Sequence, residues 1–402
     1  MLNRGRTIIP VVLTALAVGL LCVGLPILAA KAPKPPPPPP PPPGPAYSVA
    51  ELKVPQGFTY SEGLAVNDLG QVVGHVHTAA GENHAALWET SSAALTDLSN
   101  GYHPSCAYAI NNLGQVTGEC PSSVGSGHPV VWIPDGQGGY EMTDLAPDAI
   151  EGTTYDINNS GVVVGQLGPE DGWVGFLVVP EDADLDGVPD TWFLDDNGDG
   201  VNDLMFEFVR VTPCAINDLG WVVGSYRTID GARRAFLIIP DFAQPNPWFK
   251  DGDGDGVNDL IRLLPEAGSE PWEVNNRGQI IGSGVYLGGP PLWEVVVAGD
   301  GTVAVTTTKL PVPNGFDHWS AYAINDSGQV VGYASNYKGK HVSEPVLWQK
   351  DKGTMLLESP LSNMGVFSDL CYAWGINSLG QIAGRGTTSA GTRGFLATPV
   401  AP

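Results

Sequence analysis

Three acidic segments of this 402-residue chain have the residue types and the spacing to hold a metal ion. Each follows the pattern Asp-x-Asp/Asn-x-Asp-Gly-x-x-Asp, with side-chain oxygens at alternate positions and glycine at the sixth. Such a loop can wrap one hard cation at about 2.3–2.6 Å, a distance that favours Ca²⁺ over Mg²⁺. The predicted ligands are Asp182, Asp184, Asp186 and Asp190, then Asp195, Asn197, Asp199 and Asp203, then Asp251, Asp253, Asp255 and Asp259.

These loops are not EF-hands, because the twelfth position holds Phe193, Phe206 or Arg262 where an EF-hand has a bidentate glutamate. With the first two loops in tandem, they resemble the calcium loops of type 3 thrombospondin repeats. We expect a structural role, in which Ca²⁺ holds together insertions whose carboxylates would otherwise repel one another. The alternative is a solvated acidic loop without metal.

The element that must position these loops is a repeat. The segment "NDLGQVVG" at residue 67 recurs in related form six times, in steps of 44 to 59 residues. A period in this range indicates a repeat architecture. The seven copies begin at Asn67, Asn111, Asn158, Asn217, Asn275, Asn325 and Asn377.

One repeat reads as four short strands. Apolar "YAI" precedes the turn, "QVTG" follows it, a third strand carries a tryptophan, and a fourth ends in "TDL". Four antiparallel strands per period without a helical signal predict a blade of a β-propeller, since the rungs of a parallel β-helix are much shorter. We therefore predict an all-β, seven-bladed β-propeller of four-stranded antiparallel blades.

The ends of the chain indicate how the ring closes. The seventh copy ends after three strands at "GFLATPVAP", whereas "SVAELKVPQGF" near residue 50 aligns with the fourth strand that precedes the sixth copy. The N-terminal strand is therefore predicted to complete blade seven, which removes an exposed sheet edge.

The repeat resembles the HAF-type extracellular repeat over residues 47 to 398. "AVNDLGQVVG" with "HAALW" and "AINDSGQVVG" with "PVLW" carry the likeness. The histidine of that pattern is replaced in most copies, so no role is carried over from it. The resemblance implies an extracellular bacterial protein and no assigned activity.

The N-terminus is predicted to direct export. Residues 1–32 combine a basic start with a long apolar run, and fit either a cleaved signal peptide or an uncleaved membrane anchor. Residues 33–46 form a proline-rich spacer, whose nine-proline run would extend roughly 28 Å as polyproline II. The propeller then covers 47–402, with the acidic inserts at 181–204 and 250–260.

The charge balance limits the partners. The chain has 19 Lys and Arg against 43 Asp and Glu. The negative electrostatic field of this acidic excess disfavours nucleic acid and anionic membrane surfaces as partners and favours cations. Contact with a membrane is therefore expected only through an uncleaved N-terminus. We expect a monomer that binds an extracellular polysaccharide or a surface protein.

Four cysteines follow Cys22. Cys106 and Cys120 flank the hairpin of blade two symmetrically, which predicts a disulfide in an oxidising compartment. Cys214 and Cys371 belong to blades that are not neighbours, so we expect buried free thiols.

Catalytic signatures are scarce: there is no Gly-x-Ser-x-Gly elbow and no zinc spacing. The segments that join each fourth strand to the next blade are rich in rings, which either form a ligand-binding face or fill gaps between blades. The candidate face comprises Phe58, Tyr60, His103, Trp272, Phe316, His318, Trp319 and Trp374. Trp88, Trp132, Trp293 and Trp348 recur at one place in strand three and are assigned to the core.

Three functions remain open. The first is an exported, calcium-bound propeller that acts as a non-catalytic binding or cell-surface module. The second is a polysaccharide-active lyase or hydrolase on the same scaffold, which requires two or three carboxylates to converge on the channel axis. The third is a structural filler of an envelope layer.

Overall fold

The computed structural model describes residues 46–400 apart from 91–93, 122–126, 169–172, 229–230, 255–256, 266–268, 284–288, 337–342 and 358–360. The predicted signal or anchor at 1–32, and the spacer up to residue 45, lie outside the described residues. Within the described part, no helix is long and apolar enough to cross a membrane.

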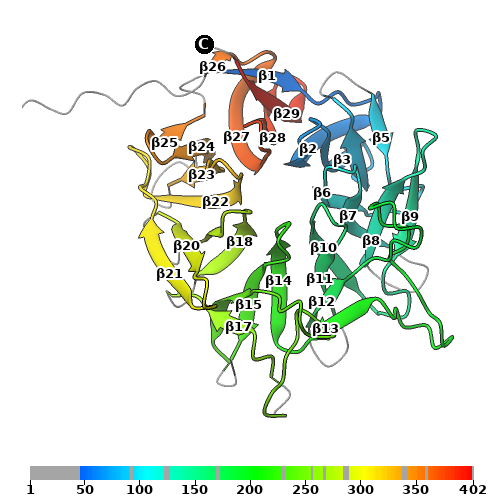
Figure 1. Ribbon diagram of the computed structural model, residues 1–402. Helices are drawn as coiled ribbons and strands as arrows, with labels where there is room; N and C mark the ends of the chain where they lie inside the picture. The colour runs from blue at the N-terminus through cyan, green and yellow to red at the C-terminus, as the bar shows by residue number, and fades with distance from the viewer. Residues whose placement is uncertain are drawn as a thin grey trace, which may run out of the picture. The chain divides into compact units, whose positions relative to one another are not determined.

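Seven sheets form the blades of a propeller ring, as predicted (Figure 1). Blade one is β2 (Phe58–Val66), β3 (Val72–Thr78), β4 (Asn83–Trp88) and β5 (Leu95–Asp97). Blade two is β6 (Cys106–Ile110), β7 (Val116–Pro121), β8 (Gly127–Pro134) and β9 (Tyr140–Asp144). Blade three is β10 (Gly152–Ile157), β11 (Val163–Leu167), β12 (Val174–Val178) and β13 (Met205–Phe208). Blade four is β14 (Val211–Ile216), β15 (Val222–Arg227), β16 (Arg233–Ile238) and β17 (Ile261–Leu263). Blade five is β18 (Glu270–Val274), β19 (Gln279–Ser283), β20 (Pro291–Val297) and β21 (Val303–Lys309). Blade six is β22 (His318–Ile324), β23 (Val330–Ser335), β24 (Ser343–Gln349) and β25 (Gly353–Leu356). Blade seven is β27 (Phe367–Ile376), β28 (Ile382–Thr388), β29 (Gly391–Pro399) and β1 (Tyr47–Glu51), with β26 (Leu361–Asn363) on its outer edge.

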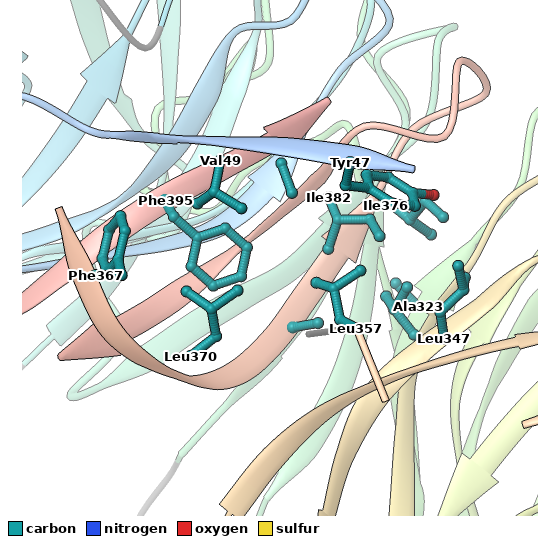
Figure 2. Close-up of a cluster of buried hydrophobic side chains, with 13 residues drawn as sticks. Tyr47, Val49, Ala323, Leu347, Leu357, Phe367, Leu370, Ile376, Ile382 and Phe395 are labelled. Carbon is teal, nitrogen blue, oxygen red and sulfur yellow. The ribbon is translucent and has the colours of Figure 1, made fainter. Parts of the chain in front are cut away.

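The N-terminal strand closes the ring as expected. β1 pairs antiparallel with β29 over five residues, from Tyr47 opposite Pro399 to Glu51 opposite Phe395. Tyr47 and Val49 project from β1 onto the same buried cluster as Phe395 (Figure 2). The joint is therefore stabilised by backbone hydrogen bonds and by apolar burial together. β26 adds one further strand, parallel to β1, which the repeat pattern did not predict.

The first residue of each repeat motif links its blade to the next. The side-chain amide of Asn67 donates to the backbone carbonyl of Asn111 at 2.9 Å, and each motif asparagine repeats this contact with the following blade. The seventh, Asn377, donates to the carbonyl of Asn67 at 2.8 Å, which completes the circle. The other five bonds start at Asn111, Asn158, Asn217, Asn275 and Asn325. We call these seven bonds the asparagine ring.

The second motif residue adds a parallel series of bonds. The backbone N–H of Asp68 donates to Asn112 Oδ1 at 2.9 Å, and the same contact recurs around the ring as far as Ser378, which donates to Asp68 Oδ1. Ser378 itself stands where the other blades have Asp or Asn. Among the described residues, the seam between blades six and seven consequently lacks this second bond.

The two motif glycines are required by geometry. The fourth motif residue has a positive φ in every copy, 80° at Gly70 for example, which a side chain would disfavour. The eighth, such as Gly74, lies against the backbone of the inner strand so closely that a Cβ would collide with the carbonyl oxygen of Glu62. The motif therefore recurs because it forms the turn, the strand contact and the blade seam at once.

The predicted core tryptophans are confirmed. Trp88, Trp132 and Trp293 are fully buried and Trp348 nearly so. In blades three and four that position holds Val178 and Ile238, and the acidic inserts follow it.

Candidate functional site

A cavity of about 1190 Å³ occupies the centre of the ring, lined by residues of the innermost strands and, in blades three and four, also of the second and third strands. Every inner strand has an irregular register at the third residue before its motif asparagine. A bulge of this kind re-aims a side chain, and here the bulged residue of every blade lines the cavity. The seven residues are Leu64, Tyr108, Tyr155, Cys214, Trp272, Tyr322 and Trp374.

Aromatic side chains therefore dominate the cavity wall. Five of these seven positions are aromatic, and Trp173, 53% exposed, adds a sixth ring from the start of β12. Tyrosine and tryptophan combine a flat apolar face with a polar edge, so the cavity suits a ligand that has both kinds of surface.

Blades five to seven carry a continuous wall of these rings. The Trp272 and Tyr322 centroids are 5.9 Å apart, and Tyr322 meets Trp374 edge-on at 4.6 Å. Trp374 stacks on Tyr372 at 5.1 Å with planes 2° apart, and Tyr372 meets Tyr333 at 4.6 Å. We call this set, Trp272, Tyr322, Tyr333, Tyr372 and Trp374, the aromatic wall.

Two carboxylates enter the cavity at one further equivalent position. The second residue before the motif asparagine is Ala or Gly in five blades but Asp156 in blade three and Glu273 in blade five. Asp156 accepts from the backbone N–H of Ile157 and, across the seam to blade four, from that of Ile216, both at 2.8 Å. Glu273 accepts from Val274 N–H at 3.0 Å.

Their surroundings favour protonation of this acid pair. Both side chains keep a partly water-accessible surface although protein surrounds them. Burial raises the pKa of Asp156 to about 7, against the opposing effect of its two backbone donors. Burial, followed by the charge of Asp156, raises the pKa of Glu273 well above its ordinary value. Carboxyls that change protonation near neutral pH can exchange protons with a ligand.

A third carboxylate beside the cavity is already fully engaged. Glu62, buried on β2, accepts from Tyr60 Oη and from Trp374 Nε1, each at 2.5 Å. Its Oε1 also lies 3.2 Å from Arg385 Nε, and Arg385 in turn lies over the Tyr372 ring at 4.5 Å. This network holds the aromatic wall in place at the seam between blades one and seven.

Three arginines of blade four line the cavity at the end where outer strands connect to the next blade. Arg210 immediately precedes β14, Arg227 ends β15 and Arg233 begins β16. Arg233 pairs with Glu270 at 3.1 Å. The guanidinium groups of Arg210 and Arg227 have no ion-pair partner among the described residues.

The acidic inserts leave the blades at the opposite end, with the motif turns. The Trp192 indole donates to Gly161 O and the Trp248 indole to Gly220 O, each at 2.8 Å, which fixes both inserts to neighbouring turns. In the first loop, carboxylate oxygens of Asp182, Asp184 and Asp190 lie within 4.8 Å of one another.

The other two loops are less gathered. No comparable group of three carboxylates forms in the second loop, as far as the structure describes it, and Asp255 of the third lies outside the described residues. All predicted ligands are oxygens, a donor set that fits Ca²⁺. The first loop therefore has the best-formed candidate cation site, and calcium binding stays a prediction.

The predicted disulfide is wrong for this structure, in which Cys106 and Cys120 are both free. Cys106 pairs across the hairpin with Glu119, so the next residue, Cys120, points to the opposite face of the sheet. Cys106 Sγ instead lies 3.5 Å from His75 Nδ1. Cys214 and Cys371 were expected to be buried, but both are only partly buried, and Cys214 faces the cavity.

The predicted aromatic face divides into two groups. Trp272 and Trp374 line the cavity, and Tyr60 contacts Glu62 beside it. The remaining five pack elsewhere: Phe58, Phe316, His318 and Trp319 lie buried or half-buried, and His103 stacks on His84 at 3.7 Å. Trp319 in particular is fully buried, because β22 already begins at His318.

Sequence reasoning missed Tyr108, Tyr155, Trp173, Tyr322 and the acid pair. An alignment of the seven motifs on their asparagines contains the signal. It shows five aromatic residues three places upstream, and two acids among small residues two places upstream.

No family model and no curated protein matches the chain. Among solved structures, it is similar to the β-propeller domain of the Trilobed protease from Pyrococcus furiosus, with a TM-score of 0.51 and 12% identity over 86% of this chain and 96% of that one. A lower similarity links it to virginiamycin B lyase from Staphylococcus aureus, with a TM-score of 0.42 and 11% identity over 88% of this chain and 100% of that one. At 12% identity the first of these comparisons shows the propeller fold alone.

Proposed function

We propose that this protein is an exported binding module that takes a carbohydrate into the central channel of its propeller. One observation carries the proposal: aromatic side chains occupy five of the seven equivalent bulge positions that face the cavity. A repeat scaffold needs no such rings for its own packing at these positions, since Leu64 and Cys214 serve in the other two blades.

The wall suits sugar rings in particular. A pyranose presents apolar C–H groups on its faces and hydroxyls around its edge, which matches a flat ring with a polar rim. The cavity volume of about 1190 Å³ exceeds that of a drug-sized pocket and leaves room for several sugar units.

Export and calcium belong to the same proposal. The apolar start of the chain would carry the propeller out of the cell, and Ca²⁺ in the acidic loops would order the inserts of blades three and four. The inserts and the channel mouth lie at opposite ends of the blades, so calcium acts on stability rather than on the ligand.

The test is binding of the purified protein to a panel of polysaccharides, measured with calcium and with a chelator. Trp272→Ala removes an exposed ring of the aromatic wall and is expected to weaken binding about tenfold or more, with the fold retained. Phe242→Ala, at an exposed ring on the insert side, is the matched control and should bind as the wild type does. A folded protein that binds no glycan in either condition would refute the proposal.

The acid pair favours a second candidate, a polysaccharide hydrolase or lyase. Asp156 and Glu273 are carboxyls with raised pKa inside a cavity, as a general acid or base requires. Incubation with each bound polysaccharide separates the two functions. Recovery of intact chains indicates binding alone, whereas shortened products that disappear in Glu273→Gln indicate an enzyme.

A further inference from the structure

We infer that the ligand of this channel is an anionic glycan that carries carboxylates, a polyuronate, and that Arg210 and Arg227 recognise its acid groups. The inference rests on the proposed function and deepens it, because it names the chemical class of the carbohydrate.

The first argument is the distribution of charge. The chain has 19 basic residues against 43 acidic ones, yet three arginines of a single blade converge on one side of the cavity. The cavity lining holds three arginines and three acids, Asp156, Glu270 and Glu273, although acids outnumber basic residues by 43 to 19 in the whole chain. Positive charge concentrated at the mouth of a concave site attracts anions.

The second argument is that two of these cations are not used within the protein. Arg233 is compensated by Glu270, and Arg385 on blade seven is compensated by Glu62. Arg210 and Arg227 are exposed, and within the described residues neither forms an ion pair. Arginine offers a planar fork of donors that matches a carboxylate with two parallel bonds.

The third argument is the backbone at Arg210. Its φ is 64°, a left-handed conformation that is uncommon outside glycine, asparagine and aspartate. Only Val209 and Arg210 separate β13 from β14, and the N–H of Arg227 donates to the Arg210 carbonyl at 2.8 Å. A less favourable backbone conformation held at a cavity rim is typical of a functional position.

The acid pair deeper in the cavity does not cancel this attraction. Burial raises the pKa values of Asp156 and Glu273, so the pair carries less than its full negative charge near neutral pH. Arg210 and Arg227 on blade four line one cavity together with Trp272, Tyr322 and Trp374 of the aromatic wall. A chain of sugars would place its faces on the rings and its carboxylates toward blade four.

The experiment compares hexamers of galacturonic acid and of mannuronic acid with their carboxyl-reduced, neutral counterparts by calorimetry on the purified protein. The uronates should bind about tenfold more tightly than the neutral hexamers, and added salt should reduce that difference. In Arg210→Gly and in Arg227→Gln, the ratio of the affinity for the uronate to the affinity for the neutral hexamer should fall to near one. The neutral hexamers should bind as they do to the wild type. Glycine suits the left-handed backbone at 210, and unchanged neutral binding shows that each variant is folded.

Arg262→Gln is the matched control, because it removes the same charge from the exposed outer strand β17 of the same blade. It should keep the preference for uronate. Equal binding of uronate and neutral hexamers, abolished by Trp272→Ala, would overturn the inference and leave the proposed function standing. A preference for uronate that survives both arginine substitutions would also overturn it. No binding of any hexamer would likewise overturn the inference, and the polysaccharide panel would then decide the proposed function separately.

Discussion

The asparagine ring makes a quantitative prediction about stability, which is clearest at Asn217. Trp221 stands four residues after Asn217. In five other blades this position holds a glutamine, whose side-chain oxygen accepts a second bond from the amide of the motif asparagine. The amide of Asn217 therefore donates to the carbonyl of Asn275 alone, at 2.9 Å. Its Oδ1 accepts from the backbone N–H groups of Leu219 and Trp221 at 3.1 and 2.9 Å.

Two substitutions separate these roles. Asn217→Ala removes all three hydrogen bonds, and at about 1 kcal/mol for each we expect a loss of about 3 kcal/mol in the free energy of unfolding. Asn217→Asp preserves both acceptor bonds but faces the carbonyl of Asn275 with a carboxylate oxygen. At neutral pH we expect Asn217→Asp to lower the free energy of unfolding by about 1–3 kcal/mol. That loss reports on the bond between the two blades alone.

The assay is urea unfolding followed by tryptophan fluorescence. Leu219→Ala in the same turn is the control, because that side chain is 49% exposed and the substitution keeps the backbone N–H that bonds Asn217 Oδ1. The deficit of Asn217→Asp should shrink on acidification, since a protonated carboxyl can donate again. An Asn217→Asp protein that unfolds at the wild-type midpoint at neutral pH would show that the ring bond contributes nothing to stability.

Three further outcomes are expected. If the acidic loops bind Ca²⁺, a chelator should lower the melting temperature of the wild type, and Asp182→Asn should reduce that difference; equal melting in calcium and chelator would contradict calcium binding. Because the pKa of Asp156 is raised to about 7 in the folded state, the stability that this group contributes is complete below the unfolded carboxyl pKa of about 4 and is lost as pH rises through about 7. Asp156→Asn should therefore flatten the decline between pH 5 and 8 seen by urea unfolding, and the raised pKa of Glu273 acts in the same direction. Since Cys106 and Cys120 are free, a reducing agent should leave the melting temperature unchanged. A drop of several degrees would instead show that the predicted disulfide forms.

The blades and their closure were predictable from the sequence, because both depend on spacing. The motif marks each inner hairpin, and the missing fourth strand after Gly394 matches the unpaired strand at Tyr47. The recurrence of tryptophan at Trp88 likewise identified a packing position. Such features repeat with the period, and seven copies distinguish them from chance.

The cavity was harder to predict because it depends on where side chains point. A single bulge turns Trp272 toward the axis, and a single step of register separates Cys120 from Cys106. Asp156 and Glu273 act on one another only because blades three and five curve round a common axis. That relation is a property of the closed ring, and neither local pattern contains it.

The asparagine ring also bears on how such a protein grows. Each blade presents the same donor on one flank and the same acceptor on the other, so its seams resemble the head-to-tail contacts of a cyclic oligomer tied into one polypeptide. A duplicated blade would find matching neighbours on both sides, whichever blade was copied. The hydrogen bonds between blades therefore do not fix the number of blades. That number depends on the angle between neighbouring blades, which determines how many of them close the ring. Among the described residues, the seam between blades six and seven lacks the second bond, so only its asparagine bond follows the common pattern there.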